Sequence, residues 1–278
     1  MRRIAIPVFC AFTLAFTAQA QTSRLYLADG YGHKVSVLQG GAVVQSTPQI
    51  HQNPGSSAIY GENAIAVSGD IRTLGTGSAS TTIGAQYSLQ GAYTGTDYAY
   101  PVSGAAFYDG TTDGVWNYTL DYNSGGLYRM DRNWTNAQLL FNAGTGGTNG
   151  ITWDQSSNTM WTSDWIGGMV RNWSMSGQLL GSWQTPFNYQ GALAMDYADG
   201  TLWLGLFYQS DNYLQYSTSG QLLQTMIVQQ MGGAQVLGGE FEVTVAPVIA
   251  TPEPASLALL GTGLLALVPI ARRRLRAR

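Results

Sequence analysis

Short stretches of alternating hydrophobic and polar residues run through most of the chain, separated by turns rich in Gly, Asp, Asn and Ser. The pattern is clearest over residues 191–233, where it predicts strands at 192–196, 201–207, 213–217 and 221–228. Period-two alternation bounded by turn residues is typical of β-strands in antiparallel hairpins. We therefore expect this segment to form a four-stranded antiparallel unit.

The same unit recurs along the chain. The hairpin between its last two strands is marked by an aromatic residue, Ser, two further residues and Gly. This marker occurs at Tyr87–Gly91, Trp173–Gly177 and Tyr216–Gly220. The offsets between successive markers are 86 and 43 residues, so one unit is 43 residues long. That is the length of a four-stranded propeller blade. A second marker, Gln-Leu-Leu, opens the last strand of a unit at Gln138–Leu140, Gln178–Leu180 and Gln221–Leu223.

A third pattern couples an Asp to a Trp seven residues later. The pairs are Asp109 with Trp116, Asp154 with Trp161, and Asp196 with Trp203. The constant offset predicts equivalent positions, with each Asp capping the turn after a first strand and each Trp packing in the core. The alternative for the three acids is a ring of carboxylates at one face, from which a glycan-cleaving enzyme would take its catalytic pair.

The two ends of the repeat region complement each other. Residues 24–27 resemble the second strand of a unit that lacks its first strand, and residues 239–243 resemble a first strand with nothing after it. Pairing the two closes a ring and removes the exposed edges of an open array. We therefore predict an all-β, five-bladed β-propeller in which residues 241–245 pair with residues 25–28. A β-sandwich is the alternative fold.

The length accommodates five blades and excludes six or seven. The first blade is shared between 24–50 and 236–245, and the others are expected at 55–97, 104–147, 148–190 and 191–233. The second blade matches the repeat least well, because Gly75–Thr82 reads as a loop.

The N-terminus has the features of a secretory signal peptide over residues 1–20, predicted as a signal helix. Arg2 and Arg3 precede an uncharged, mostly apolar run, and Ala18-Gln19-Ala20 provides a small-x-small cleavage site. An uncut membrane anchor is the alternative. Cys10, the single Cys, lies within this run, so a mature chain beginning at Gln21 has neither a thiol nor a disulfide.

The C-terminus carries a second signal. Pro252-Glu253-Pro254 precedes the uncharged run 255–271, which is long enough for a short transmembrane helix. A basic cluster follows, formed by Arg272, Arg273, Arg274, Arg276 and Arg278. Such a stop-transfer cluster stays on the cytoplasmic side and leaves the body of the protein outside. A permanent C-terminal anchor is the alternative.

This tail resembles the PEP-CTERM sorting domain, which combines a Pro-Glu-Pro motif, a short membrane-spanning stretch and a terminal Arg cluster on exported proteins of Gram-negative bacteria. The resemblance implies processing near the motif by an exosortase, a membrane-bound cysteine transpeptidase-like enzyme. It also implies an association with exopolysaccharide and biofilm material. Pro252, Glu253 and Pro254 are then a substrate tag rather than a catalytic site. Pro269, late in the apolar run, is a small departure.

These signals divide the chain into five regions. They are the signal peptide 1–20, a propeller-like repeat domain 21–246, a linker with the Pro-Glu-Pro motif 247–254, a transmembrane segment 255–271 and a basic tail 272–278.

Charged residues make up only 10% of the sequence. Without its two terminal signals, the chain over 21–250 holds six basic and fifteen acidic residues, a net charge of −9. This excess of acid disfavours nucleic acid and anionic membrane surfaces as partners. It also repels acidic polysaccharide unless a divalent cation bridges the two.

No catalytic constellation or cofactor motif is recognisable, and we expect neither a catalytic site nor a cofactor. The only histidines, His33 and His51, are read as turn or surface residues, and the sequence leaves open whether a metal binds. All eight Trp residues lie between Trp116 and Trp203. Packing between blades is the simpler role for them, and stacking on sugar rings is the alternative.

We therefore expect an exported, surface- or matrix-associated protein without catalytic activity that binds a partner or acts as a scaffold. Its expected partners are an exosortase, the membrane before processing, and exopolysaccharide. The alternatives are a glycan-acting hydrolase or lyase using propeller-face carboxylates, and a structural matrix component. Convergent, unequal carboxylates in a funnel would favour an enzyme, and exposed aromatic residues on a face of turns would favour binding.

Overall fold

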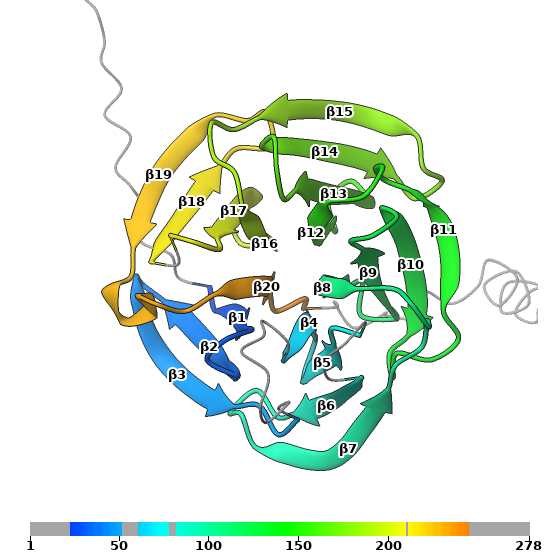
Figure 1. Ribbon diagram of the computed structural model, residues 1–278. Helices are drawn as coiled ribbons and strands as arrows, with labels where there is room; N and C mark the ends of the chain where they lie inside the picture. Colours follow the sequence, from blue (N-terminus) through cyan, green and yellow to red (C-terminus); the bar gives the residue numbers. More distant parts are fainter. Residues whose placement is uncertain (1–22, 52–60, 78–81, 210, 245–278) are drawn as a thin grey trace, which may run out of the picture. The chain divides into compact units, whose positions relative to one another are not determined.

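The computed structural model describes residues 23–51, 61–77, 82–209 and 211–244. Within these residues, five four-stranded antiparallel sheets are arranged around a central axis (Figure 1). We number these blades in the order in which the chain enters them.

From the axis outward, the first blade consists of β20 (Val236–Phe241), β1 (Leu25–Asp29), β2 (Lys34–Gln39) and β3 (Ala42–Pro48). The second consists of β4 (Glu62–Val67), β5 (Ile71–Gly75), β6 (Ile83–Tyr87) and β7 (Tyr93–Ala99). The third consists of β8 (Phe107–Thr112), β9 (Trp116–Asp121), β10 (Gly126–Asp131) and β11 (Gln138–Asn142). The fourth consists of β12 (Thr148–Asp154), β13 (Thr159–Asp164), β14 (Met169–Ser174) and β15 (Leu179–Gln184). The fifth consists of β16 (Gln190–Asp196), β17 (Thr201–Leu206), β18 (Asn212–Tyr216) and β19 (Leu222–Ile227), and the short 3₁₀ helix η1 (Gln229–Met231) leads to β20.

The predicted closure of the ring is confirmed, with one correction. The last strand pairs with β1 in antiparallel register, Leu25 opposite Phe241 and Ala28 opposite Gly238. The closing strand is therefore Val236–Phe241, earlier than the predicted 241–245. Gly238 lies within this strand, and a Cβ there would lie 2.1 Å from the Asn63 carbonyl oxygen. The glycine thus allows a close approach of β20 to the neighbouring blade rather than a turn.

The hairpin marker also has its predicted structure. Gly91, Gly177 and Gly220 have φ angles of +86°, +85° and +86°, which favour glycine over residues with a Cβ. In the turns of the fourth and fifth blades, Ser174 and Ser217 accept a hydrogen bond at Oγ, each 3.0 Å long, from the backbone amide four residues later. The marker thus encodes the turn between the third and fourth strands of a blade.

The Asp-Trp pattern holds in only two of three blades. Trp161 and Trp203 lie in the core, 5% and 1% exposed. The equivalence fails in the third blade, because β8 continues past Asp109 to Thr112. Trp116 consequently starts β9 and is half-buried under the Arg129 guanidinium, 4.6 Å from its ring. Tyr118 occupies the position of the core tryptophans.

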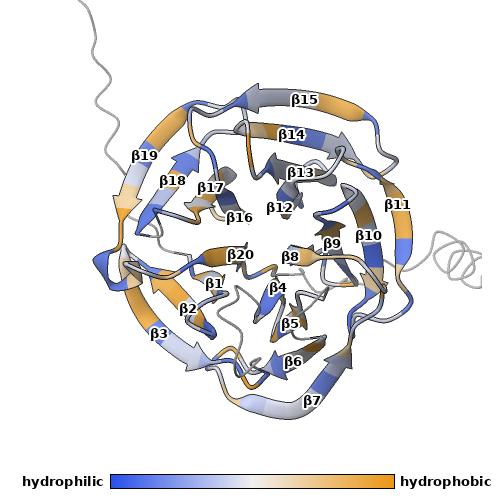
Figure 2. Cartoon of the chain, in the orientation of Figure 1, coloured by the Kyte–Doolittle hydropathy of each residue, from blue (hydrophilic) through white to orange (hydrophobic). Residues whose placement is uncertain are grey.

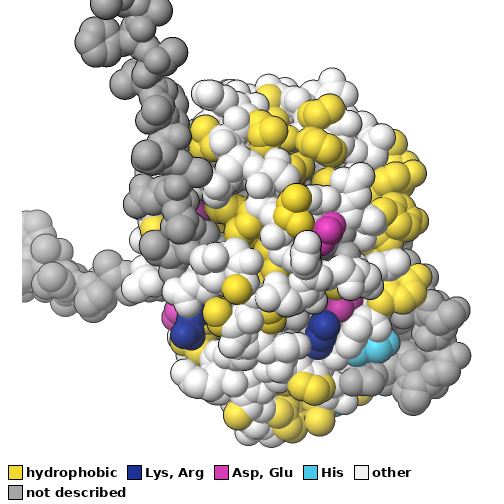
Figure 3. Space-filling model, turned by 90° about the vertical axis from the view of Figure 1, so that its left-hand side faces the viewer, with side chains coloured by type: hydrophobic (Ala, Val, Ile, Leu, Met, Phe, Trp, Pro, Cys, Tyr) yellow, Lys and Arg dark blue, Asp and Glu magenta, His cyan; other side chains and the backbone are white. Residues whose placement is uncertain are grey.

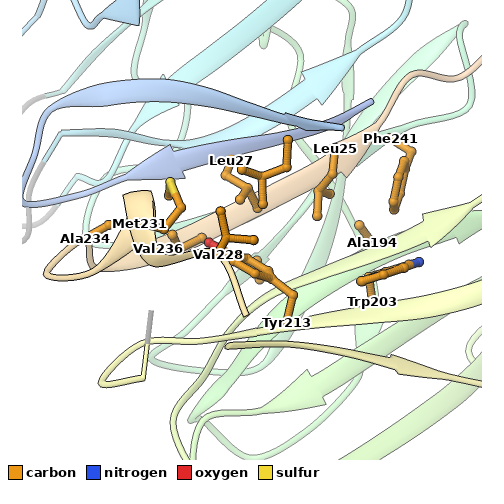
Figure 4. Packing of buried hydrophobic residues seen from close by; sticks show 12 residues of the cluster. Leu25, Leu27, Ala194, Trp203, Tyr213, Val228, Met231, Ala234, Val236 and Phe241 are labelled. Atoms are coloured by element: carbon orange, nitrogen blue, oxygen red, sulfur yellow. The ribbon is translucent and has the colours of Figure 1, made fainter. Parts of the chain in front are cut away.

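The core lies between adjacent blades. At the junction that closes the ring, Leu25 and Leu27 of β1 face the fifth blade, and the Phe241 and Trp203 rings lie 6.4 Å apart (Figure 4). Burying such side chains contributes about 1.5–3 kcal/mol each. Apolar residues are not confined to the core, since hydrophobic segments colour the outer strands β11, β15 and β19 (Figure 2). These segments include the leucines of the Gln-Leu-Leu marker, which are about half exposed except for the more buried Leu140.

The predicted signal helix, the membrane segment, the Pro-Glu-Pro motif and the basic tail lie outside the described residues. Over the described ranges, no helix has the length and hydrophobicity needed to span a bilayer.

A fully buried carboxylate occupies the centre of the ring. Oδ1 of Asp109 accepts hydrogen bonds from the amides of Gly110 and Gly239, each 2.9 Å long. Its Oδ2 accepts from Ile151 at 3.0 Å and Leu193 at 3.1 Å. The four donors belong to β8, β20, β12 and β16, so this axial carboxylate links four of the five blades. Burial raises the pKa of Asp109 well above its usual range, although the four amide bonds act to lower it. All four of its hydrogen-bond partners are backbone N–H donors.

A second layer of side chains lies beside the axial carboxylate. Thr111 Oγ1 accepts the Trp153 amide at 3.1 Å, and Thr152 Oγ1 accepts the Met195 amide at 3.0 Å. Glu240 is buried in this layer, and its Oε2 has no hydrogen-bond partner among the described residues. Burial, reinforced by the charge of Asp109, raises the pKa of Glu240 well above its usual range.

We predict that Asp109→Asn destabilises the propeller by about 3 kcal/mol or more, because the new amide group opposes N–H donors that have no other acceptor. Urea denaturation of the mature body measures the loss. The control is Asp211→Asn, at a half-buried position whose carboxylate accepts one side-chain bond, from Asn212. Equal stability of the two variants would contradict the role of Asp109.

We predict that Glu240→Gln stabilises the body relative to wild type, and increasingly so from pH 4 to pH 8. A folded-state pKa raised above the unfolded value of about 4.3 means that wild-type stability is lost as the pH rises towards the folded-state pKa. Gln carries no such titration. Urea midpoints across this pH range test the prediction, and a difference that shrinks with pH would refute it.

Candidate functional site

The two ends of the propeller differ in character. One end, which we call the terminal face, carries Ser23 and Thr244, the first and last described residues, together with the turns after β12 and β16. The opposite end is formed by the loops that follow β1, β9, β13 and β17, and by the starts of the inner strands. We call it the aromatic face, because five of its rings form a connected cluster.

The cluster is centred on Trp165 and Phe207, whose ring centroids are 4.9 Å apart. Tyr189 packs against Trp165 at 5.5 Å, and Tyr208 packs against both Tyr189 and Phe207 at 4.7 and 4.9 Å. Tyr31 reaches Phe207 from the first blade at 6.3 Å. Tyr208 is 65% exposed, and Tyr31 and Tyr189 are 44% and 40% exposed. These three rings therefore present accessible surface, whereas Phe207 between them is buried, 3% exposed.

A pocket of about 210 Å³ lies beside this cluster, where β8, β12 and β20 begin. Its walls are Tyr108, Tyr122, Asn149, Trp165 and Leu237. Asn149 is buried, and its Oδ1 has no hydrogen-bond partner within the described part of the chain. The pocket thus combines aromatic walls with one buried amide side chain, whose Oδ1 has almost no accessible surface. We refer to the pocket and the five rings together as the aromatic cup.

The carboxylates at the aromatic face accept hydrogen bonds or form an ion pair within the protein. Asp29, Asp121 and Asp164 end the second strands of their blades at equivalent positions. Asp29 accepts the amides of Tyr31, Gly32 and Gln235. Asp121 accepts the amides of Ala106 and Asn123 and the hydroxyl of Ser124. Asp164 pairs with Arg171 at 2.6 Å. Of these three, Asp164 lines a pocket between the third and fourth blades.

The three acids singled out in the sequence do not form a ring at one face. Asp154 and Asp196 cap turns on the terminal face, as predicted, accepting the amides of Ser156 and Ala198 at 2.8 and 3.0 Å. Burial raises the pKa of Asp196, whereas in Asp154 the bonds from its turn outweigh burial and lower the pKa. Asp109 is the exception, because it lies within β8 at the axis.

The histidines lie in or beside loops. His51 Nε2 lies 2.8 Å from Asp97 Oδ1, which also accepts the Tyr93 hydroxyl at 2.6 Å. The Tyr93 bond and then the His51 bond lower the pKa of Asp97. His33 is half-buried in the β1–β2 turn. In the part of the chain that is described, no three His, Cys, Asp or Glu side chains are grouped to hold a metal ion.

The tryptophans outside the repeat divide between packing and the cup. Trp134 is fully buried, and Trp173 and Trp183 are half-buried against Phe141 and Tyr216. Trp165 alone belongs to the cup. Its signal was present in the sequence, because an aromatic residue occurs within two positions of the second strand's end in four blades: Tyr31, Tyr122, Trp165 and Phe207 with Tyr208.

Solved structures similar to this chain are propellers. A chain of a nidogen–laminin complex matches with a TM-score of 0.55 at 11% identity, covering 81% of this chain and 100% of its own. A protein of unknown function from Bacteroides thetaiotaomicron matches with a TM-score of 0.50 at 13% sequence identity, and the match covers 75% of this chain and 58% of the other. The glutaminyl cyclase of Myxococcus xanthus matches with a TM-score of 0.48 at 13% sequence identity, and the match covers 80% of this chain and 76% of the cyclase chain. At such identities the similarity shows the fold alone.

No curated protein matches this sequence significantly. The model of the PEP-CTERM protein-sorting motif matches residues 250–276, so the chain carries this sorting motif at its C-terminus.

Proposed function

We propose that the mature body is a non-catalytic glycan-binding module, which associates with neutral exopolysaccharide at the cell surface through the aromatic cup. The address is given by the PEP-CTERM motif, which implies export, processing by an exosortase and sorting to the surface of a Gram-negative bacterium. In this proposal, the propeller body provides the binding site for the glycan at the cell surface.

The observation that carries the proposal is the cluster of aromatic rings, three of them at least 40% exposed, beside a pocket with aromatic walls. Sugar rings have C–H faces that pack against aromatic side chains. Apolar walls with a few placed polar groups are typical of small-molecule sites. Tyr and Trp supply apolar area at low entropic cost.

Charge narrows the class of glycan. The body over 21–250 carries a net charge of −9, and the side view in Figure 3 shows few charged side chains among polar and hydrophobic ones. An acidic body repels acidic polysaccharide, so we propose a neutral glycan. The carboxylates of the aromatic face are engaged by loop amides, hydroxyls and Arg171, which favours binding over hydrolysis.

We predict that Trp165→Ala and Tyr208→Ala each weaken binding to neutral polysaccharide about five- to tenfold, because each removes stacking area worth about 1 kcal/mol or more. A glycan array with the mature body identifies the ligand, and calorimetry measures the variants. The matched control is Tyr93→Ala, since Tyr93 is 39% exposed on β7, an outer strand. Equal losses in all three variants, or no neutral glycan bound on the array, would refute the proposal.

We also predict the fate of the tail. Mass spectrometry of the surface or secreted form is expected to find a C-terminus near Pro252–Pro254. Replacing these three residues with alanine is expected to leave the chain in the membrane fraction, because the apolar run and the arginines remain. Mature protein that still ends at Arg278, in cells that contain an exosortase, would contradict this prediction.

A further inference from the structure

A second pocket opens between the third and fourth blades, next to the aromatic cup. It has a volume of about 340 Å³ and is lined by Asn142 and Gly144 of the third blade's end, Thr148 and Asp164, and Arg171 and Trp173 of β14. Unlike the cup, it is rich in polar side chains. We call it the polar pocket.

The polar pocket contains a preformed ion pair with spare hydrogen-bonding capacity. Arg171 Nη1 donates to Asp164 Oδ1 at 2.6 Å, and Thr148 Oγ1 donates to the same oxygen at 3.3 Å. Within the described residues, Asp164 Oδ2 and Arg171 Nη2 make no hydrogen bond. A guanidinium beside a carboxylate offers donors and an acceptor side by side, which suits the neighbouring hydroxyl groups of a sugar.

The two pockets adjoin through consecutive residues. Thr148 and Asp164 line the polar pocket, and the residues that follow them, Asn149 and Trp165, line the cup. Gly147 lies at the junction, because its carbonyl accepts the Trp165 amide at 2.7 Å. A Cβ at Gly147 would meet no atom within 4 Å, so the space above it is open. We call this open space beside Gly147 the saddle.

We propose that the cup and the polar pocket are two subsites of one groove, which binds a neutral polysaccharide strand along its length as it crosses Gly147. Sugar rings stack in the cup, and hydroxyl groups further along the strand bond to Asp164 and Arg171. This inference rests on the proposed function. It specifies a ligand recognised internally, over several sugar units, rather than a single terminal sugar.

A length series tests the inference. The probes are di- to hexasaccharides made by partial hydrolysis of the neutral polysaccharide that binds best on the array. For the wild type, we expect affinity to rise about tenfold or more from the disaccharide to the hexasaccharide, because the second subsite is engaged by the same strand. Wild-type affinity that is independent of length would overturn the groove and leave the proposed function intact. Binding of no glycan at all would overturn both.

Gly147→Asn tests the crossing point. Asn tolerates the φ of +75° at this position and places a side chain in the open saddle. We expect it to abolish the gain with length while leaving disaccharide affinity unchanged. The matched control is Gly200→Asn on the terminal face, where φ is +71° and a Cβ also meets nothing within 4 Å. An unchanged length dependence in Gly147→Asn, or an equal loss in the control, would overturn the inference.

Arg171→Gln tests the polar subsite. It removes the charge and most donors of the guanidinium, and circular dichroism verifies that the fold is kept. We expect the hexasaccharide to lose most of its advantage over the disaccharide, with no change for the disaccharide. A variant that weakens both probes equally, or neither, would show that the polar pocket is not a subsite.

Discussion

The rest of the propeller depends on how its inner strands satisfy the amides that face the axis. Each inner strand pairs with a neighbour on one side only, so amides on the other side need acceptors from elsewhere. Asp109 supplies two oxygens to four such amides from β8, β12, β16 and β20. A buried carboxylate is stabilised only by such complete hydrogen bonding. Its position therefore fixes the spacing of four blades, and the glycines of β20 fit the closing strand to that spacing.

The axial carboxylate also explains why the candidate site is at an end of the ring. Asp109, Glu240 and the threonines beside them are buried at the axis, which leaves the loops as the surfaces available to a ligand. The aromatic cup lies at the end of this filled axis, with Tyr108 and Leu237 close in sequence to Asp109 and Gly238. Two of its rings, Tyr31 and Tyr122, lie in loops that Asp29 and Asp121 hold by hydrogen bonds. Such support pre-organises a site and lowers the ordering cost of binding.

Much of the fold was predictable because its signals are local and repeated. The hairpin turns need glycine at a positive φ, so their glycines recur at fixed offsets along the sequence. The first unit lacks a first strand and the last unit is followed by an extra one, which predicted how the ring closes. Asp109 was misread because its offset to Trp116 matched the other pairs by coincidence, and no local pattern shows that β8 continues through it. The aromatic cup was missed for a related reason: its rings occupy loops at slightly different offsets, and only their packing, such as Trp165 on Phe207, brings them together. The Arg171–Asp164 pair joins neighbouring strands, but its place beside Asn142 of another blade is a tertiary property.

The two faces of the ring differ in which parts of the chain they carry. Val243, near the end of the described chain, donates its amide to Val67 at the end of β4, so the segment leading to the motif starts from the terminal face. The aromatic cup is at the opposite end, where β4, β8, β12 and β16 begin. The described residues therefore end at the terminal face, opposite the aromatic cup. They do so because β20, the strand that closes the ring on β1, carries the chain from the aromatic face to the terminal face.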